Sequence, residues 1–203
     1  MTNYDKLIRY FEDFPGIGSR QAKRFINHLL VQPESNLSEF AELVKNIQSS
    51  VATCDRCFRF FNRRGTETNC TICTDPERDE TKLMILERDA DLTAIERSGT
   101  YDGLYFILGG TISLLNSDDT KKLRGGALKN HISANQETLK EIILAFSVNP
   151  DGENTSRYVE SLFKEVAGES GIKISYLGRG LSTGSELEYA DPETIKNALQ
   201  NRS

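Results

Sequence analysis

The side chains best suited to bind a metal ion are four cysteines, which are all the cysteines in the chain. Cys54 and Cys57 form one pair with two residues between them, and Cys70 and Cys73 form a second pair with the same spacing. Each pair can hold one edge of a tetrahedral zinc ion, and four thiolates close its coordination shell. A closed shell leaves no place for an activated water, so the spacing predicts one structural Zn2+. The alternatives are a redox dithiol or four unrelated free thiols.

Arginines surround the cysteines in sequence. A zinc ion with four thiolates carries about two net negative charges, which nearby guanidinium groups can neutralise. DNA contact is a second role that the same arginines allow, and the sequence leaves both open. The residues are Arg56, Arg59, Arg63 and Arg64.

A second candidate site lies in the segment FPGIGSRQAKRF (14–25). Gly16 and Gly18 allow a tight turn whose backbone amides point outward at the start of a helix, where an anion is favoured. Arg20, Lys23 and Arg24 follow, and Arg20 and Arg24 share one helix face. This arrangement resembles a helix-hairpin-helix motif, which holds DNA by its phosphates without reading bases. The alternative is a plain helix connector with a solvated basic face.

Three helices are expected to position these residues. Apolar spacing predicts a helix over residues 2–13, and a second one that Ser19 can cap and that ends before Pro33. A third, short helix is expected to begin after Asn36 and to lead into the cysteines.

After Cys73 the pattern changes to short apolar runs that alternate with helical stretches. Such alternation indicates an α/β fold with a parallel sheet covered on both faces. The polar residues 116–136 are expected to form a helical region, and a final helix is expected after a cap at Asp191. The expected strands are 82–87, 103–110, 141–147 and 172–178.

Three acidic residues follow the expected strands. Glu87 ends one apolar run, and Asp151 and Glu153 lie in the loop after another. Ligands of open parallel sheets collect at such loops, and converging carboxylates there can hold Mg2+. The alternatives are an acidic surface for a basic partner, or a solvated rim.

Charge is unevenly distributed along the chain. The whole chain carries a formal charge of -5, but residues 1–73 hold 10 Lys and Arg against 8 Asp and Glu, a balance of +2. Residues 74–203 hold 15 against 22, a balance of -7. If the protein binds DNA, the first third is expected to do so. The sequence has no apolar run of about 18 residues and no signal-peptide pattern, so we expect a cytoplasmic protein.

The order of these parts resembles the bacterial RecR family of recombination proteins. The resemblance rests on PGIGSRQAKRFINHLL, on CDRC and CTIC with twelve residues between them, on ILERDADLTAIERSGTYDGLYFILGG, on ILAFSVNPDGENTSRYV and on LGRGLSTGSELEYAD. These blocks cover nearly the whole chain. The resemblance implies four parts, namely a helix-hairpin-helix (1–53), a four-cysteine zinc finger (54–73), a Toprim domain (80–177) and a C-terminal Walker-B-like oligomerisation segment (178–203).

The resemblance also implies a function. Members of the family are recombination mediators rather than catalysts, and they form ring-shaped homotetramers that can encircle DNA. They act with RecO, and often with RecF, to load RecA on gapped or SSB-coated single strands. The resemblance therefore implies DNA, these proteins and further copies of the same chain as partners, and an association with the nucleoid.

Carried over residue by residue, the resemblance assigns Arg20 and Arg24 to the basic positions of the hairpin and the four cysteines to zinc. It assigns Glu87 to the Toprim glutamate, and Asp151 and Glu153 to an acidic pair. Some positions depart from related patterns. Active Toprim enzymes carry two aspartates where this chain has Ser147 and Asn149, the usual histidine of the family is Phe106, a usual proline is Leu114, and a glycine-rich segment is replaced by LLNSDDTKKLRGG.

Two other function classes stay open at this point. A Mg2+-dependent Toprim nuclease or topoisomerase would need a full acidic cluster, and a topoisomerase would also need a nucleophilic tyrosine. A protein-interaction module would use the acidic sheet domain without DNA binding. No phosphate loop of the type GxxxxGK[ST] occurs, so the segment at 181–191 is expected to make subunit contacts rather than to hydrolyse ATP.

Overall fold

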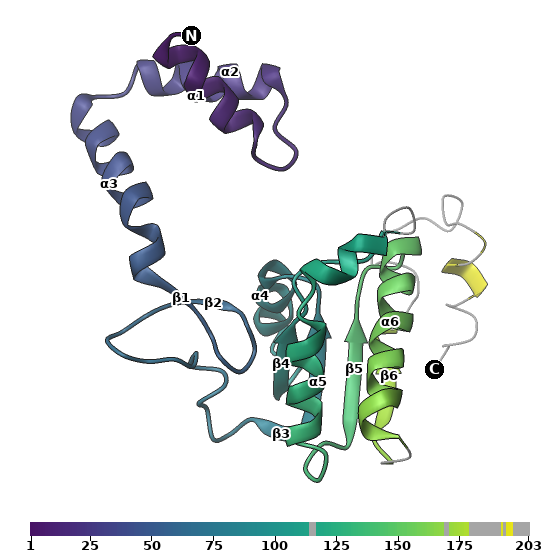
Figure 1. Cartoon of the computed structure of the whole chain (residues 1–203). Coiled ribbons are helices and arrows are strands. Elements are labelled where there is room, and N and C mark those ends of the chain that lie inside the picture. The colour runs from purple at the N-terminus through teal and green to yellow at the C-terminus, as the bar shows by residue number, and fades with distance from the viewer. Residues whose placement is uncertain (114–116, 169–170, 179–191, 193, 197–203) are drawn as a thin grey trace. The chain divides into compact units, whose positions relative to one another are not determined.

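The computed structural model describes the chain except residues 114–116, 169–170, 179–191, 193 and 197–203. The chain divides into two compact units (Figure 1), an N-terminal unit of Met1–Val51 and a C-terminal unit of Ala52–Ser203. The expected oligomerisation segment at 178–203 and its subunit contacts at 181–191 lie outside the described residues, apart from 178, 192 and 194–196. Among the described residues, no helix is both long and apolar enough to cross a membrane.

The N-terminal unit consists of helices α1 (Asn3–Glu12), α2 (Ser19–Leu30) and α3 (Glu34–Ser50). Thr2 caps α1, since its side chain accepts from the Asp5 amide and the Asp5 carboxylate accepts from the Thr2 amide. Helices α1 and α2 pack against each other around a small buried core. The buried residues of this core are Ile8, Ala22 and Ile26.

Helix α3 differs from the other two because none of its residues is buried. It begins at Glu34, after Pro33, and not after Asn36 as expected, and it is a long helix of 17 residues. Proline directly before a helix is tolerated because the first helical amides lack intrahelical acceptors. Its apolar residues recur at helical spacing on one exposed stripe, which we call the α3 stripe: Phe40, Leu43, Val44 and Ile47.

The C-terminal unit is built on a four-stranded parallel sheet with strand order β4-β3-β5-β6 (Figure 1). Helix α4 connects β3 to β4, α5 lies between β4 and β5, and α6 connects β5 to β6. A 3-10 helix, η1 (Ser117–Lys122), precedes α5 (Gly125–Ala134). The remaining bounds are β3 Asp79–Leu86, α4 Asp89–Ser98, β4 Gly103–Ile107, β5 Glu141–Ala145, α6 Pro150–Ala167 and β6 Lys173–Tyr176.

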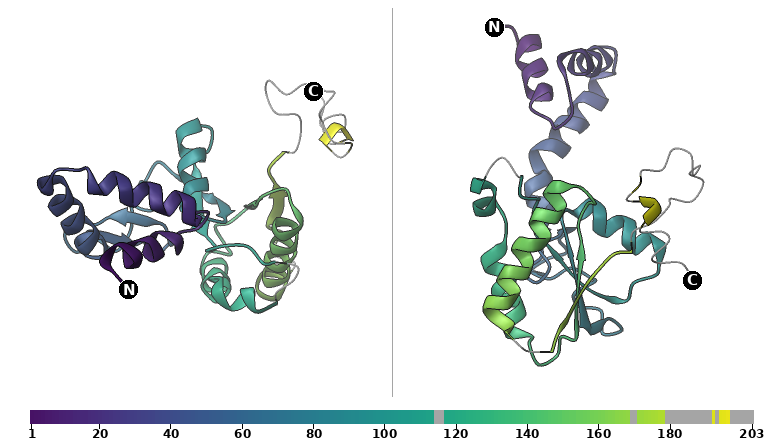
Figure 2. Two further views of the ribbon diagram at one scale, coloured as in Figure 1. Left: turned by 90° about the horizontal axis from the view of Figure 1, so that it is seen from above. Right: turned by 90° about the vertical axis from the view of Figure 1, so that its right-hand side faces the viewer.

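Alternating side chains bury both faces of this sheet. On one face Leu83 and Ile85 pack with residues of α5 and α6, and on the other face Met84 and Leu86 pack with Leu92 of α4. Figures 1 and 2 show α5 and α6 side by side on one face and α4 on the other. The expected α/β fold with a doubly covered parallel sheet is therefore confirmed.

Two very short strands were not expected from the sequence. β1 (Val51–Thr53) and β2 (Phe60–Asn62) form a separate two-stranded sheet that flanks the first cysteine pair. Three-residue strands leave too little periodicity to be recognised in a sequence. This small sheet and the cysteine segment up to Cys73 are called the knuckle below.

Candidate metal centre and anion-binding hairpin

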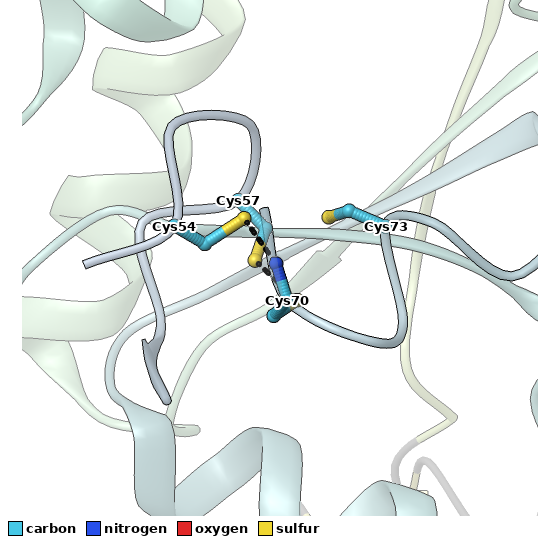
Figure 3. Close-up of side chains that lie close together, drawn as sticks. All are labelled: Cys54, Cys57, Cys70 and Cys73. Atoms are coloured by element: carbon cyan, nitrogen blue, oxygen red, sulfur yellow. Dashed lines mark hydrogen bonds between the residues drawn. The ribbon is translucent and has the colours of Figure 1, made fainter. Parts of the chain in front are cut away.

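The four cysteines are buried and their sulfurs lie within 4.8 Å of one another. The Sγ atoms of Cys57 and Cys70 are 3.6 Å apart. Tetrahedral zinc with Zn–S bonds of about 2.3 Å requires sulfurs about 3.8 Å apart, so this spacing fits the ion. Figure 3 shows the sulfur of Cys73 directed toward the other three residues. Among the described residues, this is the one group of three or more candidate ligands that lie close together.

Local hydrogen bonds shape each half of the knuckle. The Phe58 amide donates to the Cys54 carbonyl at 3.0 Å, and the Cys54 amide donates to the Arg59 carbonyl at 2.9 Å. From the second half, the Cys70 amide donates to the sulfur of Cys54 at 3.3 Å. These bonds close the first cysteine pair into a tight turn and tie it to the second pair.

The protons of the four thiols are strongly interdependent. Hydrogen bonds from Cys57, Cys70 and Cys73 lower the pKa of Cys54, while hydrogen bonding to Cys54, Cys57 and Cys70 raises the pKa of Cys73. Buried sulfurs this close cannot all be thiolates unless a cation compensates their charge. The donor set and its burial therefore fit a thiolate-binding metal ion.

The knuckle is part of the C-terminal unit's core. The Ile107 amide of β4 donates to the Cys57 carbonyl at 2.8 Å, so the knuckle covers the edge of the sheet. Phe58 has a positive φ of 62°, an uncommon conformation for a bulky residue. Its ring packs 5.2 Å from Phe106, and the Arg124 guanidinium lies 5.4 Å from its centre. These contacts hold the turn in its strained conformation.

The knuckle arginines fall into two groups. Arg56 donates to the Cys73 carbonyl at 2.8 Å and pairs with Glu80 at 3.5 Å, so it links both halves of the knuckle. Arg59 is half-buried, and its Nε has no hydrogen-bond partner among the described residues. Arg63 and Arg64 are exposed. Arg56 is thus bonded to the cysteine segment, Arg59 is partly covered, and Arg63 and Arg64 face solvent.

The hairpin turn places its cations on the outside of the N-terminal unit. Arg20, Lys23 and Arg24 of α2 are exposed, while Ala22 and Ile26 of the same helix are buried. No acidic residue lies in the first turn of α2, so no carboxylate there opposes an anion at the positive end of the helix. The structure thus presents a basic helix face beside a helix N-terminus.

The two glycines of this turn have different roles. Gly16 has φ of 77°, which favours glycine, whereas Gly18 has φ of -89° and is the N-cap of α2. Ser19 was expected to cap this helix but is its first residue, and instead the Gly18 amide donates to Oε1 of Gln21 at 3.3 Å. A Cβ at position 18 would meet no atom within 4 Å. Gly18 therefore leaves open space beside the helix start.

The three acids lie at one end of the sheet, because β3 and β5 are parallel neighbours. Glu87 directly follows β3 but is buried, and its Oε1 pairs with Nη2 of Arg88 at 2.8 Å. Asp151 and Glu153 are half-buried in the first turn of α6. No group of described carboxylates converges as the cysteines do.

The start of α6 is built tightly against the end of β5. Oδ1 of Asn149 accepts from the Gly152 amide at 2.8 Å and so caps the helix. A Cβ at Gly152 would lie 1.9 Å from the Ser147 carbonyl oxygen, so glycine is needed there. Sequence reasoning did not foresee the cavity of about 240 Å3 beside this turn, which Glu153, Val148 and Tyr176 help to line.

Comparisons with known proteins cover both units. Residues 81–178 match the family model of the Toprim domain, and residues 180–203 match that of the RecR C-terminal region. Proteins named Recombination protein RecR are similar over nearly full length. The one from Lactobacillus acidophilus is 34% identical over 97% of this chain and 94% of its own length. Those from Prochlorococcus marinus (strain MIT 9312) and Synechococcus sp. (strain CC9311) are 35% and 37% identical, over 98% and 97% of this chain and 94% and 98% of their own lengths.

Proposed function

Since this chain belongs to the RecR family of recombination proteins, we propose that it is a DNA-binding recombination mediator without catalytic turnover. The family supports a role in recombination and DNA repair. The observation that carries DNA binding is the exposed basic face of α2 beside a helix N-terminus whose first turn holds no acidic residue. The protein is expected to act in the cytoplasm, on the DNA of the nucleoid.

In this proposal the hairpin binds phosphates of the DNA backbone. Arg20 and Arg24, one turn apart, contact the backbone, and Lys23 adds a third charge. Gly16 shapes the turn, and Gly18 lets a phosphate approach the first amides of α2. Such contacts carry no base information, so the hairpin binds many sequences.

The metal of the knuckle is proposed to be one structural zinc ion. Zinc is supported by four buried sulfurs within 4.8 Å of one another, of which those of Cys57 and Cys70 lie 3.6 Å apart, close to the spacing in a tetrahedral zinc site. Because four cysteines close the shell, the ion has no open position for substrate. Its role is to hold the knuckle against β4 and α4.

The proposal of no turnover rests on the acids at the end of the sheet. Asn149, where active Toprim enzymes carry an aspartate, uses its side chain to cap α6. Glu87 is covered and paired with Arg88. A Mg2+-dependent nuclease or topoisomerase would need carboxylates free to converge on the metal. A DNA cleavage or relaxation assay with Mg2+, compared with Glu87→Ala, tests this choice, and turnover above that control would overturn it.

For the acids we propose a docking role toward a basic partner protein, of which RecO is the first expectation and RecF the second. Asp151 and Glu153 are the better placed residues, because Glu87 is covered and already paired with Arg88. The cavity beside Glu153 adds apolar walls for an aliphatic or basic side chain. RecA and SSB are linked to this function through the DNA on which the proteins act.

Self-association into a homodimer or ring-shaped homotetramer completes the proposal. The α3 stripe supports it, because Phe40, Leu43, Val44 and Ile47 are 48–64% exposed and cover one helix face. A stripe of this kind is typical of a surface that another protein covers. A second copy of this chain is the proposed occupant.

Molar mass by light scattering, with and without DNA and at two salt concentrations, tests the whole proposal. We expect an oligomer that binds DNA tightly near 50 mM salt and more weakly near 200 mM, because phosphate contacts release counterions. A monomer that binds no DNA at either salt concentration would overturn the proposal of a ring-shaped, DNA-binding oligomer. An oligomer that does not bind DNA but binds a basic protein would favour the alternative, a protein-interaction module without DNA binding.

A further inference from the structure

An exposed aromatic side chain stands on the outer face of the knuckle. Phe60 of β2 is 56% exposed, while its neighbour Phe61 is half-buried against the core that contains the cysteines. Because side chains alternate along a strand, Phe60 and the exposed Asn62 point to the same side of β2. The ring of Phe60 therefore lies on the surface of a strand whose inner side is already filled by Phe61.

The backbone on both sides of Phe60 is held in place. Its amide donates to Oδ1 of Asp89, at the start of α4, at 2.8 Å. The preceding carbonyl, that of Arg59, accepts from the Cys54 amide at 2.9 Å. A phenyl ring has two rotatable bonds, so little conformational freedom is lost when a ligand contacts it. Phe60 is thus a flat, exposed apolar side chain on a backbone that hydrogen bonds hold in place.

Cations follow this ring directly. Residues 59–67 contain three arginines and one glutamate. Of these arginines, Arg63 and Arg64 are exposed, and Gly65 with φ of 78° turns the chain immediately after them. An aromatic platform next to exposed cations is the combination that binds single-stranded nucleic acid, where bases stack on rings and phosphates lie on the cations.

We propose that Phe60 stacks on an unpaired base of single-stranded or gapped DNA while Arg63 and Arg64 bind the neighbouring phosphates. This inference rests on the proposed DNA-binding function and adds a preference that the hairpin does not provide. The hairpin holds phosphates, which duplex and single strands share, whereas a ring can stack only on a base that is not already stacked in a duplex. The knuckle therefore selects DNA with an unpaired region.

The absence of tryptophan from the chain makes a direct test possible. Phe60→Trp in the full-length, zinc-loaded protein introduces one indole and keeps a flat aromatic ring. We expect its fluorescence to be quenched by a single-stranded oligonucleotide, and not by a duplex of the same length or by an abasic strand with the same phosphates. Equal quenching by the intact and abasic strands would overturn the stacking.

An affinity measurement on the natural residue complements this test. Phe60→Leu keeps an apolar side chain but removes the ring, and it is expected to weaken single-strand binding between about 5-fold and 150-fold. Duplex binding should be unchanged. In the unmodified protein, the abasic strand should show the same loss. Zinc content equal to that of the parent confirms that the variant folds.

The outcomes separate this inference from the function on which it rests. If the unmodified protein binds neither strand nor duplex, the proposed DNA-binding function fails. If it binds both, but Phe60→Leu and the abasic strand leave single-strand affinity unchanged, the stacking alone is refuted. If Phe60→Leu instead lowers the molar mass of the oligomer with DNA affinity intact, the ring belongs to a protein contact and the proposal is wrong.

Discussion

The hairpin and the knuckle hold their candidate functional residues in opposite environments. In the hairpin, the cations of α2 are exposed and the core beneath them consists of three residues, Ile8, Ala22 and Ile26. In the knuckle, the four cysteines are themselves buried in a core shared with β3, β4 and α4. Substitution of hairpin cations should therefore change binding with little effect on folding. Substitution of knuckle cysteines should change folding first.

Metal removal should have the largest effect, and it should be confined to the C-terminal unit. Structural zinc contributes on the order of 10 kcal/mol to the folding of such sites, so Cys73→Ser or a chelator is expected to expose β3 and β4 to hydrogen exchange. The amides of α1 and α2 should keep their protection. Hydrogen-exchange mass spectrometry with zinc analysis measures both. Thr71→Ser, at an exposed position between two of the cysteines, is the matched control.

Loss of protection in α1 and α2 together with β3 would contradict the independent folding of the two units. Retained protection of β3 in a zinc-free chain would show that the metal is not structural.

Charged substitutions on the α3 stripe are expected to have the second largest effect, which concerns assembly rather than folding. The double substitution Leu43→Glu/Ile47→Glu places two charges on the α3 stripe, whose side chains are exposed in the described chain. We expect the molar mass in light scattering to fall to that of a smaller assembly, with helix content unchanged in circular dichroism. Lys45→Glu, on the same helix and 72% exposed at its side chain, should leave the mass unaltered. An unchanged mass in the double variant would remove α3 from the interface.

An ion pair beside the knuckle predicts a smaller, pH-dependent effect on stability. Nη2 of Arg78 lies 2.5 Å from Oε2 of Glu96, and the Tyr105 hydroxyl also donates to this carboxylate. The hydrogen bond from Arg78 lowers the pKa of Glu96. The stabilisation is thus present above the unfolded-state pKa and is lost as pH falls through the lower folded-state pKa.

Glu96→Gln is therefore expected to reduce the unfolding free energy by about 1 kcal/mol near pH 7. The difference from the parent should shrink in acid. Urea denaturation at a series of pH values measures it, and exposed Glu67→Gln in the same unit is the control. A constant difference across the series would mean that the charge of Glu96 does not matter.

The two glycines of the hairpin give the smallest effects and the sharpest contrast. Gly16→Ala forces alanine into a positive φ and should cost about 1 kcal/mol of stability. Gly18→Ala meets no atom within 4 Å and should cost less, but its methyl group lies in the path of a phosphate. We expect it to weaken DNA binding more than stability, as read by fluorescence polarisation and urea denaturation. Normal DNA affinity in Gly18→Ala would place the phosphate elsewhere.

The sequence predicted the sheet well because each strand is a short apolar run between helical patterns. The strand expected at 82–87, for example, is β3, which spans Asp79–Leu86. It also predicted that the four cysteines come together at one place that could hold a metal ion, because two cysteine pairs with this spacing allow few other arrangements. It did not predict how the knuckle packs. The hydrogen bond from the Ile107 amide to the Cys57 carbonyl joins residues that are 50 positions apart. The spacing of the cysteines carries no information about which edge of the sheet the knuckle covers.

The sequence also did not predict which arginines and acids are accessible to a ligand. Arg56 and Arg63 look alike in the sequence, yet one bonds to the Cys73 carbonyl and the other faces solvent. Glu87 was expected among the acids that could face a cation or a partner, but it is buried and pairs with Arg88. Residue type indicated the possible chemistry, and tertiary packing decided which side chains are accessible.

The most direct test of the contrast between hairpin and knuckle is the duplex DNA affinity, measured from about 50 to 200 mM salt, of two double variants. Arg20→Ala/Arg24→Ala should weaken binding strongly and reduce the slope of log affinity against log salt by about 1.8, which corresponds to two lost phosphate contacts. Arg63→Ala/Arg64→Ala should have a clearly smaller effect on duplex DNA, and both variants should retain zinc and parental stability. Parental affinity and slope in the Arg20→Ala/Arg24→Ala variant would contradict the account.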